Sequence, residues 1–195
     1  MLKTAACFAS ILLLTTAVAT GAAQAQALAA SSATMAPASH PGAKLAHADA
    51  EFLKQAAQNG HAEVEGSQLA LTRAASPEVK AFAQKMVDEH TQSSQELKAL
   101  AASKGVTVPD TSSIVQKAKL KLLSARDGAS FDKHYADTVG VKAHQDTVKL
   151  FQKAADQAKD PEVKAFATKT LPILQHHLDM SRDLYALVHK DQKKP

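Results

Sequence analysis

The sequence contains no tryptophan, one cysteine, seven glycines and seven prolines among its 195 residues. A single cysteine excludes an internal disulfide framework and a zinc module built from several cysteines. So few glycines and prolines argue against an all-β sandwich and against a disordered low-complexity chain. Alanine is abundant instead, with dispersed lysine, glutamate and glutamine, and this composition favours helices. The length suits one domain that can bury a core.

Motifs for several classes of activity are also missing. No glycine-framed serine suggests a hydrolase nucleophile, and no glycine-rich loop suggests a phosphate site. The formal net charge is +4, but the basic residues are dispersed among acidic ones, without the interleaved aromatic residues on which single strands stack. We therefore predict no nucleic-acid partner, and we favour a non-enzymatic role over an enzymatic one.

The N-terminus has the features of a secretory signal. Lys3 supplies a positive charge, residues 5–19 form an apolar stretch, and residues 23–25 (Ala-Gln-Ala) form a small-x-small cleavage pattern. The apolar stretch is shorter than the roughly 20 residues that a membrane-spanning helix needs, which disfavours an uncleaved anchor. We predict that residues 1–25 are a signal peptide. The mature chain is then periplasmic or secreted, with no membrane span after cleavage.

A seven-residue phrase, PEVKAFA, occurs at residues 77–83 and again at residues 161–167. Each copy follows a helix-capping residue, Ser76 or Asp160, and places proline at the first helical position. The glutamate that follows lies near the positive end of the helix dipole. Both copies therefore predict a tight turn between two helices. We predict long helices over residues 48–74, 77–104, 130–159 and 161–190, and a short helix over residues 113–125.

This arrangement predicts an all-α four-helix bundle, made of two repeated helical hairpins with a short connecting helix, over residues 47–190. Residues 26–46 mix alanine, serine and proline without a period, which is typical of a flexible leader. Residues 191–195 read as a polar tail.

Each long helix carries one residue able to bind a metal within its apolar stripe: Glu63, His90, His144 and His177, in chain order. Measured from the first turn, Glu63 and His90 differ in height by only about 4 Å. His144 and His177 stand at nearly equal heights from the second turn. If the two hairpins pack with approximate twofold symmetry, all four side chains fall in one layer.

Two interpretations of this layer stay open. One carboxylate and three imidazoles suit a single Zn, Cu, Fe or Mn ion. The same residues also suit a buried polar network without metal, in which Glu63 accepts hydrogen bonds from the imidazoles. Beside the layer, we expect Asp88 and Glu89 to be solvated unless kinked helices bring one of them in. We expect His176 to flank the layer, or to substitute as a ligand if its helix is rotated, and Asp137 to be a partner of His144 or an exposed acid.

The phrases PEVKAFAQKMVDEH (77–90) and LPILQHHLDM (171–180) resemble an exported bacterial family catalogued as domain of unknown function 4142. The resemblance covers roughly residues 48–188 and implies a ferritin-like four-helix bundle and an exported location. It implies no catalytic residue. Ferritin-like di-iron proteins carry Glu-x-x-His on each of two helices, whereas Val87 and Leu174 precede His90 and His177 at that spacing.

Three functions follow from these observations, in order of preference. The first is an exported bundle that binds one transition-metal ion in its core. The second is a metal-free interaction or stress-response protein of the cell envelope, with a protein partner there. The third is a ferritin-like oxidoreductase, which lacks its expected glutamates. Metal content separates the first from the second.

Overall fold

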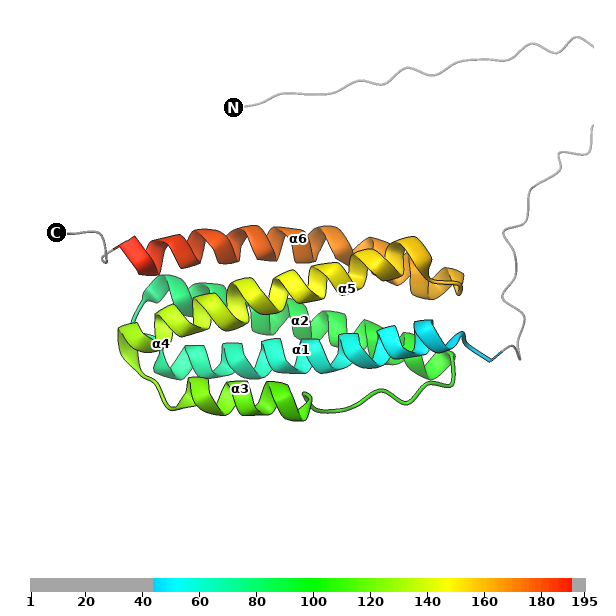
Figure 1. Ribbon diagram of the computed structural model, residues 1–195, viewed down its shortest axis with the longest axis horizontal. Helices are drawn as coiled ribbons and strands as arrows, with labels where there is room; N and C mark the ends of the chain where they lie inside the picture. Colours follow the sequence, from blue (N-terminus) through cyan, green and yellow to red (C-terminus); the bar gives the residue numbers. More distant parts are fainter. Residues whose placement is uncertain (1–43, 191–195) are drawn as a thin grey trace, which may run out of the picture. The chain divides into compact units, whose positions relative to one another are not determined.

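The computed structural model describes residues 44–190, and within that range the chain forms only helices and their connections (Figure 1). The all-α prediction is thus confirmed for this part of the chain. None of its helices is both long and apolar enough to cross a membrane. The predicted signal peptide, the leader up to residue 43 and the tail lie outside the described residues. The segments are α1 (His47–Arg73), α2 (Pro77–Ser103), α3 (Ile114–Ser124), α4 (Gly128–Tyr135), the π-helix η1 (Ala136–Ala143), α5 (His144–Gln157) and α6 (Pro161–His189).

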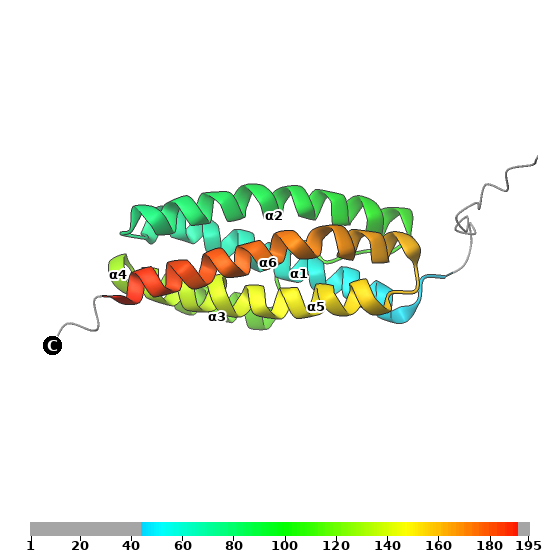
Figure 2. The same cartoon turned by 90° about the horizontal axis from the view of Figure 1, so that it is seen from above.

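The long helices pack in pairs. α1 lies along α2, and α5 lies along α6, with α1 also against α5 and α2 also against α6 (Figures 1 and 2). The short helix α3 runs along the outside of α1 and reaches α4 at its end. Hydrogen bonds from Ser112 to Glu65 and from Gln116 to Asn59 hold α3 in this place. The result is a helical bundle with one connecting helix on its surface.

The two copies of PEVKAFA each begin a helix, α2 and α6, as the sequence predicts. Ser76 and Asp160 are the N-caps, and each side chain accepts hydrogen bonds from two backbone N–H groups of the turn that follows. Proline occupies the first turn of both helices, where its missing N–H costs no helical hydrogen bond. The same local chemistry therefore sets both tight turns.

The helical run α4–η1–α5 is continuous, and if α4 and η1 are counted with the α5–α6 pair, each helix pair caps the turn of the other. The buried carboxylate of Asp132, in α4, accepts hydrogen bonds from the backbone N–H groups of Ala75 and Ser76. The buried carboxylate of Asp49, in α1, does the same for Lys159 and Asp160. These reciprocal bonds fix how far one pair can slide along the other, because a shift by one turn would leave buried polar groups unpaired.

The third long helix differs from its prediction. A single α-helix was expected over residues 130–159, but the helical run begins at Gly128 and contains a π-helix over residues 136–143. Asp49 and Asp132, which perform the same capping role, are 83 residues apart, whereas Glu63 and Thr147, which face each other, are 84 residues apart. One extra residue has to be accommodated between Asp132 and Thr147, and a wider π-helical turn does this without breaking the helix.

The apolar core is divided into two clusters by a polar layer. One cluster fills the end of the bundle near the α1–α2 turn, and the other fills the opposite end near the α5–α6 turn. Along every long helix, one residue of the polar layer stands between members of the two clusters. The first cluster includes Phe82, Met86, Phe131 and Tyr135, and the second includes Phe52, Leu97, Phe151 and Phe166.

Candidate metal centre

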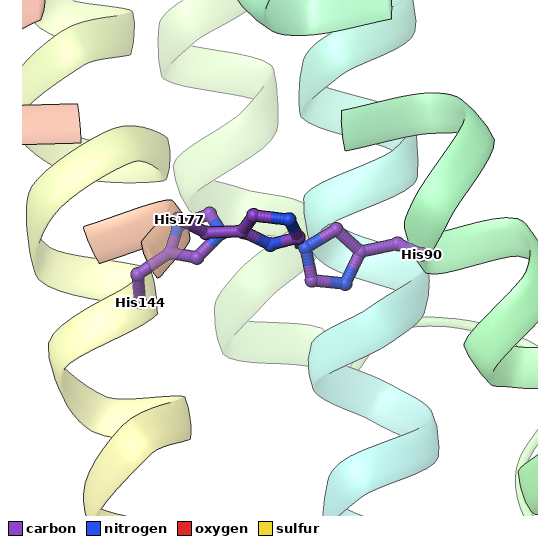
Figure 3. Close-up of side chains that lie close together, drawn as sticks. All are labelled: His90, His144 and His177. Carbon is purple, nitrogen blue, oxygen red and sulfur yellow. Dashed lines mark hydrogen bonds between the residues drawn. The ribbon is translucent and has the colours of Figure 1, made fainter. Parts of the chain in front are cut away.

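The polar layer consists of the four residues predicted from the sequence. Glu63 comes from α1, His90 from α2, His144 from the start of α5, and His177 from α6. All four side chains are buried, with at most 5% of any residue exposed. The three imidazoles point toward one another across the bundle (Figure 3). Charged or polar groups buried this deeply are retained only where something pairs them.

The three histidines form a compact group. Nε2 of His90 lies 3.3 Å from Nε2 of His144, and one nitrogen from each ring can be chosen so that all three lie within 4.8 Å of one another. Glu63 stands just outside this group, with Oε2 3.1 Å from Nδ1 of His90. The structure therefore brings together all four predicted residues, with the histidines at the centre and the carboxylate behind one of them.

Each imidazole has one nitrogen that faces the other two rings, called here the inner nitrogen, and one that faces away, the outer nitrogen. Each outer nitrogen lies close to an oxygen. Nδ1 of His144 donates to the backbone carbonyl of Gly140 at 2.8 Å, within the π-helix. Nε2 of His177 donates to Glu89 Oε2 at 2.5 Å, and Nδ1 of His90 faces Glu63. Because carbonyl and carboxylate oxygens accept hydrogen bonds, the outer nitrogens of His144 and His177 carry the ring protons, which leaves their inner lone pairs free. The contact between His90 and Glu63 is not aligned as a hydrogen bond and does not place the proton of His90.

The inner nitrogens are not all paired. Nε2 of His90 and Nε2 of His144 face each other at 3.3 Å, where His90 can donate a hydrogen bond to His144. The third inner nitrogen, Nδ1 of His177, is buried and has no hydrogen-bond partner among the described residues. Oε2 of Glu63 is also buried without one, since its close contact with His90 is not aligned as a hydrogen bond. A cation placed among the three rings would satisfy the nitrogens.

A proton is poorly suited to be that cation. Burial lowers the pKa of His90 to about 3, and repulsion from His144 acts in the same direction. Burial also lowers the pKa of His177 to about 4, reinforced by repulsion from His90. These two rings are therefore neutral at neutral pH, which is the form that binds metals.

The two carboxylates of the site behave differently. Burial raises the pKa of Glu63, against opposing effects from His144 and the hydrogen bond from Thr147. Burial also acts to raise the pKa of Glu89, but hydrogen bonds from Lys85 and His177 outweigh it and hold this pKa below its usual range. Glu89 is therefore the ionised carboxylate of the site, and it is about one-third exposed.

The sequence analysis missed three features of this site. Glu89 was expected to be solvated, yet it orients His177 from the neighbouring position to His90. Thr147 was not predicted to have a role, yet it donates to Glu63 at 2.9 Å. The π-helix that supplies the carbonyl for His144 was also unforeseen. A clue existed for Thr147, since it lies 84 residues after Glu63, the offset of the repeated phrase.

Other nearby candidates take no part in the layer. Asp137 does not contact His144 and instead pairs with Lys142 near the surface, at 2.8 Å. His176 is exposed, next to His177 but outside the group of three. Tyr135, expected at the edge of the core, is fully buried and hydrogen-bonded to Ser67 at 2.9 Å.

Comparisons with known proteins place the chain among helical proteins of unassigned role. The model of a family described as domain of unknown function (DUF4142) matches residues 33–184. No curated protein matches the chain. A solved DUF305 fragment from Deinococcus radiodurans is similar in structure, with a TM-score of 0.64 and 14% identity over 76% of this chain and 99% of that one. A conserved hypothetical protein from Mycobacterium tuberculosis is also similar, with a TM-score of 0.52 and 14% identity over 71% and 91% of the two chains. At such low identity, these likenesses concern the fold alone.

Proposed function

The chain belongs to the DUF4142 family, and we propose that it is an exported, ferritin-like four-helix bundle that binds one transition-metal ion in its core. His90, His144 and His177 supply the nitrogen ligands in this proposal. Glu63 lies behind His90, with Oε2 3.1 Å from its Nδ1, and binding, not catalysis, is the role. Export rests on the predicted signal at residues 1–25, and the mature protein would act in the periplasm or outside the cell.

The observation that carries the proposal is the group of inner nitrogens. His90 Nε2 and His144 Nε2 face each other at 3.3 Å, and Nδ1 of His177 has no partner among the described residues. The outer nitrogens of His144 and His177 are hydrogen-bonded to the carbonyl of Gly140 and to Glu89, and Nδ1 of His90 lies 3.1 Å from Glu63. Metal-binding histidines are typically oriented in this way, with the second nitrogen fixed by a carboxylate or a backbone carbonyl.

The ligand types also rank the metals. Three imidazoles without a thiolate suit Zn(II), Cu(II) and Fe(II), and affinity at such sites rises toward Cu(II). Mn(II) prefers oxygen ligands and ranks last. Three protein ligands would leave a further coordination position on a tetrahedral ion.

A second candidate function is a metal-free envelope protein with a buried polar network. The raised pKa of Glu63 supports it, because a protonated Glu63 could donate to His90, which could then donate to His144. This network leaves Nδ1 of His177 unpaired, and the contact between Glu63 and His90 is not aligned for it. The metal proposal accounts better for the unpaired Nδ1 of His177. A di-iron oxidoreductase fits least, because Val87 and Leu174 occupy the positions of its glutamates.

The test is metal content followed by titration. Residues 26–195, purified from periplasm without a histidine tag, should contain about one metal per chain by elemental analysis. The chelator-treated protein should then bind Zn(II), Cu(II) or Fe(II), and His144→Ala should lower the affinity at least about tenfold. His176→Ala is the matched control, since this exposed histidine lies beside the group without joining it, and its affinity should stay unchanged. No binding at micromolar metal, or equal binding by His144→Ala, would overturn the proposal.

A further inference from the structure

Two openings flank the histidine layer on different sides of the bundle. A groove of about 560 Å³ lies between α2 and α6, and its lining includes His90, His177 and Glu89. A cavity of about 370 Å³ lies among α1, α3, η1 and α5, and its lining includes Glu63 and Thr147 but none of the three histidines. A third cavity, lined by Glu63, His90 and Thr147, measures only about 20 Å³, and the ends of the bundle are filled by the two apolar clusters. The two larger openings are therefore the candidate routes for an ion.

The groove between α2 and α6 leads directly to ligand atoms. Two of the three histidines line it, and Glu89 connects them to solvent. The carboxylate of Glu89 is about one-third exposed, and its Oε2 bonds His177 at 2.5 Å. A cation that enters from solvent therefore meets the partly exposed carboxylate of Glu89 before the buried imidazole of His177. Carboxylate and imidazole are both ligands of the ions that suit the site.

Charge also favours the groove. Its two lysines are each paired with a carboxylate, Lys85 with Glu89 and Lys169 with Glu96. The first pair joins residues four apart on an exposed helix surface, and such pairs are weak enough for a cation to displace the lysine. The positive charges of the groove are thus balanced along the path of the ion.

The cavity on the other side is less suited to a cation. Lys119, Lys142 and Asp146 line it; Lys142 pairs with Asp137, and Lys119 has no ion-pair partner among residues 44–190. At its inner end, the hydrogen bond from Thr147 to Glu63 stands between the cavity and the histidines. An ion taking this route would have to pass the lysines and then break a buried hydrogen bond, which is costly.

We propose that the metal ion enters and leaves the core through the groove between α2 and α6, with Glu89 as the first ligand it meets. This inference rests on the proposed function, since it needs an ion that binds at the histidine layer. Glu89 then has two tasks: it holds His177 in its orientation, and it passes the incoming ion to the inner nitrogens.

The first test narrows each opening and measures binding kinetics. Ile173 lines the groove with 45% of its surface exposed, so Ile173→Trp should obstruct the groove without disturbing the core. Stopped-flow mixing with Zn(II) should show association and dissociation rates that fall together by about tenfold, with an unchanged Kd, as expected when only the path is altered. Lys119→Trp is the matched control in the other cavity, and its rates should equal those of the wild type. Slowing by Lys119→Trp and not by Ile173→Trp would overturn the proposal.

The second test separates the two tasks of Glu89. If Glu89 meets the ion first, Glu89→Gln should lower the association rate for Zn(II) by about tenfold or more. If Glu89 only orients His177, Glu89→Gln should raise the dissociation rate and leave the association rate unchanged, and this result would contradict its role as first ligand. Glu96→Gln is the control, because Glu96 lines the same groove and pairs with Lys169 without touching a histidine. Both of its rates should stay within about twofold of wild type.

The two levels of the proposal fail in different ways. Absence of Zn(II) binding to the wild-type protein at equilibrium would contradict the proposed function itself. Equilibrium binding that needs His144, combined with rates insensitive to Ile173→Trp and Glu89→Gln, would leave the metal centre in place and refute only the route.

Discussion

The helix pair α1–α2 and the helix pair α5–α6 use the same devices to fold but contribute different residues to the site. Each pair turns at a capped Pro-Glu-Val-Lys sequence, and each offers one buried aspartate, Asp49 or Asp132, to the turn of the other. In the layer, by contrast, Glu63 on α1 corresponds to Thr147 on α5 at the repeat offset, and the two bond each other. The scaffold is therefore repeated, while the candidate site is not.

The histidines show the same asymmetry. At the repeat offset of 84 residues, His144 corresponds to a glycine, His90 to a leucine and His177 to a serine: Gly60, Leu174 and Ser93. Gly60 has little room for a side chain, since a Cβ there would lie 3.0 Å from Ser94 Oγ. One pair thus brings one histidine and one glutamate, the other brings two histidines, and only their packing creates a group of three. The residues that differ between the two helix pairs therefore form the candidate site, and the residues that repeat form the turns of the fold.

The largest expected loss of stability tests whether the two turns are held alike by their buried aspartates. Asp49→Ala and Asp132→Ala should each lower the free energy of unfolding by about 2–4 kcal/mol, because each leaves two backbone N–H groups of a tight turn without their acceptor. Urea unfolding followed by circular dichroism measures this loss. Asp179→Ala, which removes only an exposed pair with Arg182, should change stability by less than about 0.5 kcal/mol. A clear loss in one aspartate variant but not in the other would show that the two turns are not held alike.

A smaller effect tests the difference at the layer. Thr147→Val keeps the shape of the side chain but removes the donor to buried Glu63, and should cost about 1–2 kcal/mol of unfolding free energy in metal-free protein. Thr168→Val is the control, since its hydroxyl bonds only a backbone carbonyl on the exposed side of α6. If Thr147→Val is as harmless as this control, the bond between the two equivalent positions does not stabilise the layer.

The smallest effect compares the two caps. Asp160→Ser gives the second turn the cap of the first, and loses the ion pair with Lys104 at 3.0 Å, for a cost of about 0.5–1 kcal/mol at pH 7. Burial acts to raise the pKa of Asp160, but hydrogen bonds from Lys104 and from two backbone N–H groups outweigh it and lower this pKa. A lowered pKa stabilises the folded state above the unfolded value of about 3.9 and loses this stabilisation as pH falls through the folded value.

The difference between Asp160→Ser and wild type should therefore shrink between pH 7 and a pH below the unfolded value of about 3.9, as the carboxyl becomes protonated in the folded state as well. Urea unfolding at both pH values measures this difference. Lys104→Met should lower the free energy of unfolding less in the Asp160→Ser variant than in wild type. A difference that is equally large at both pH values would show that the charge of Asp160 has no part in its role as a cap.

Much of the fold could be predicted because its signals are local. The caps at Ser76 and Asp160 set the starts of α2 and α6, and the apolar periodicity placed all four residues of the layer on inward faces. The π-helix was not predicted because it accommodates one extra residue between Asp132 and Thr147. These two residues contact different partners on the other helix pair, and both contacts have to be made at once. No periodicity within residues 128–157 reveals that requirement.

Glu89 shows the same limit for the site. Its place beside His90 in the sequence suggested a solvated face, because neighbours on a helix point about 100° apart. The approach of α6 brings His177 to that face, so the carboxylate becomes a partner of the group while remaining partly exposed. Sequence periodicity describes one helix at a time and cannot show which neighbour covers its flank.

The sequence by itself determined the helices, their turns and which residues face inward, since caps, proline and apolar spacing act within a few residues along the chain. Tertiary structure alone decided that the three inner nitrogens converge, and that Glu63, Gly140 and Glu89 lie against the outer ones. These contacts join residues on different helices or across a change of helical register. They exist only once the two helix pairs have packed with their buried aspartates in each other's turns.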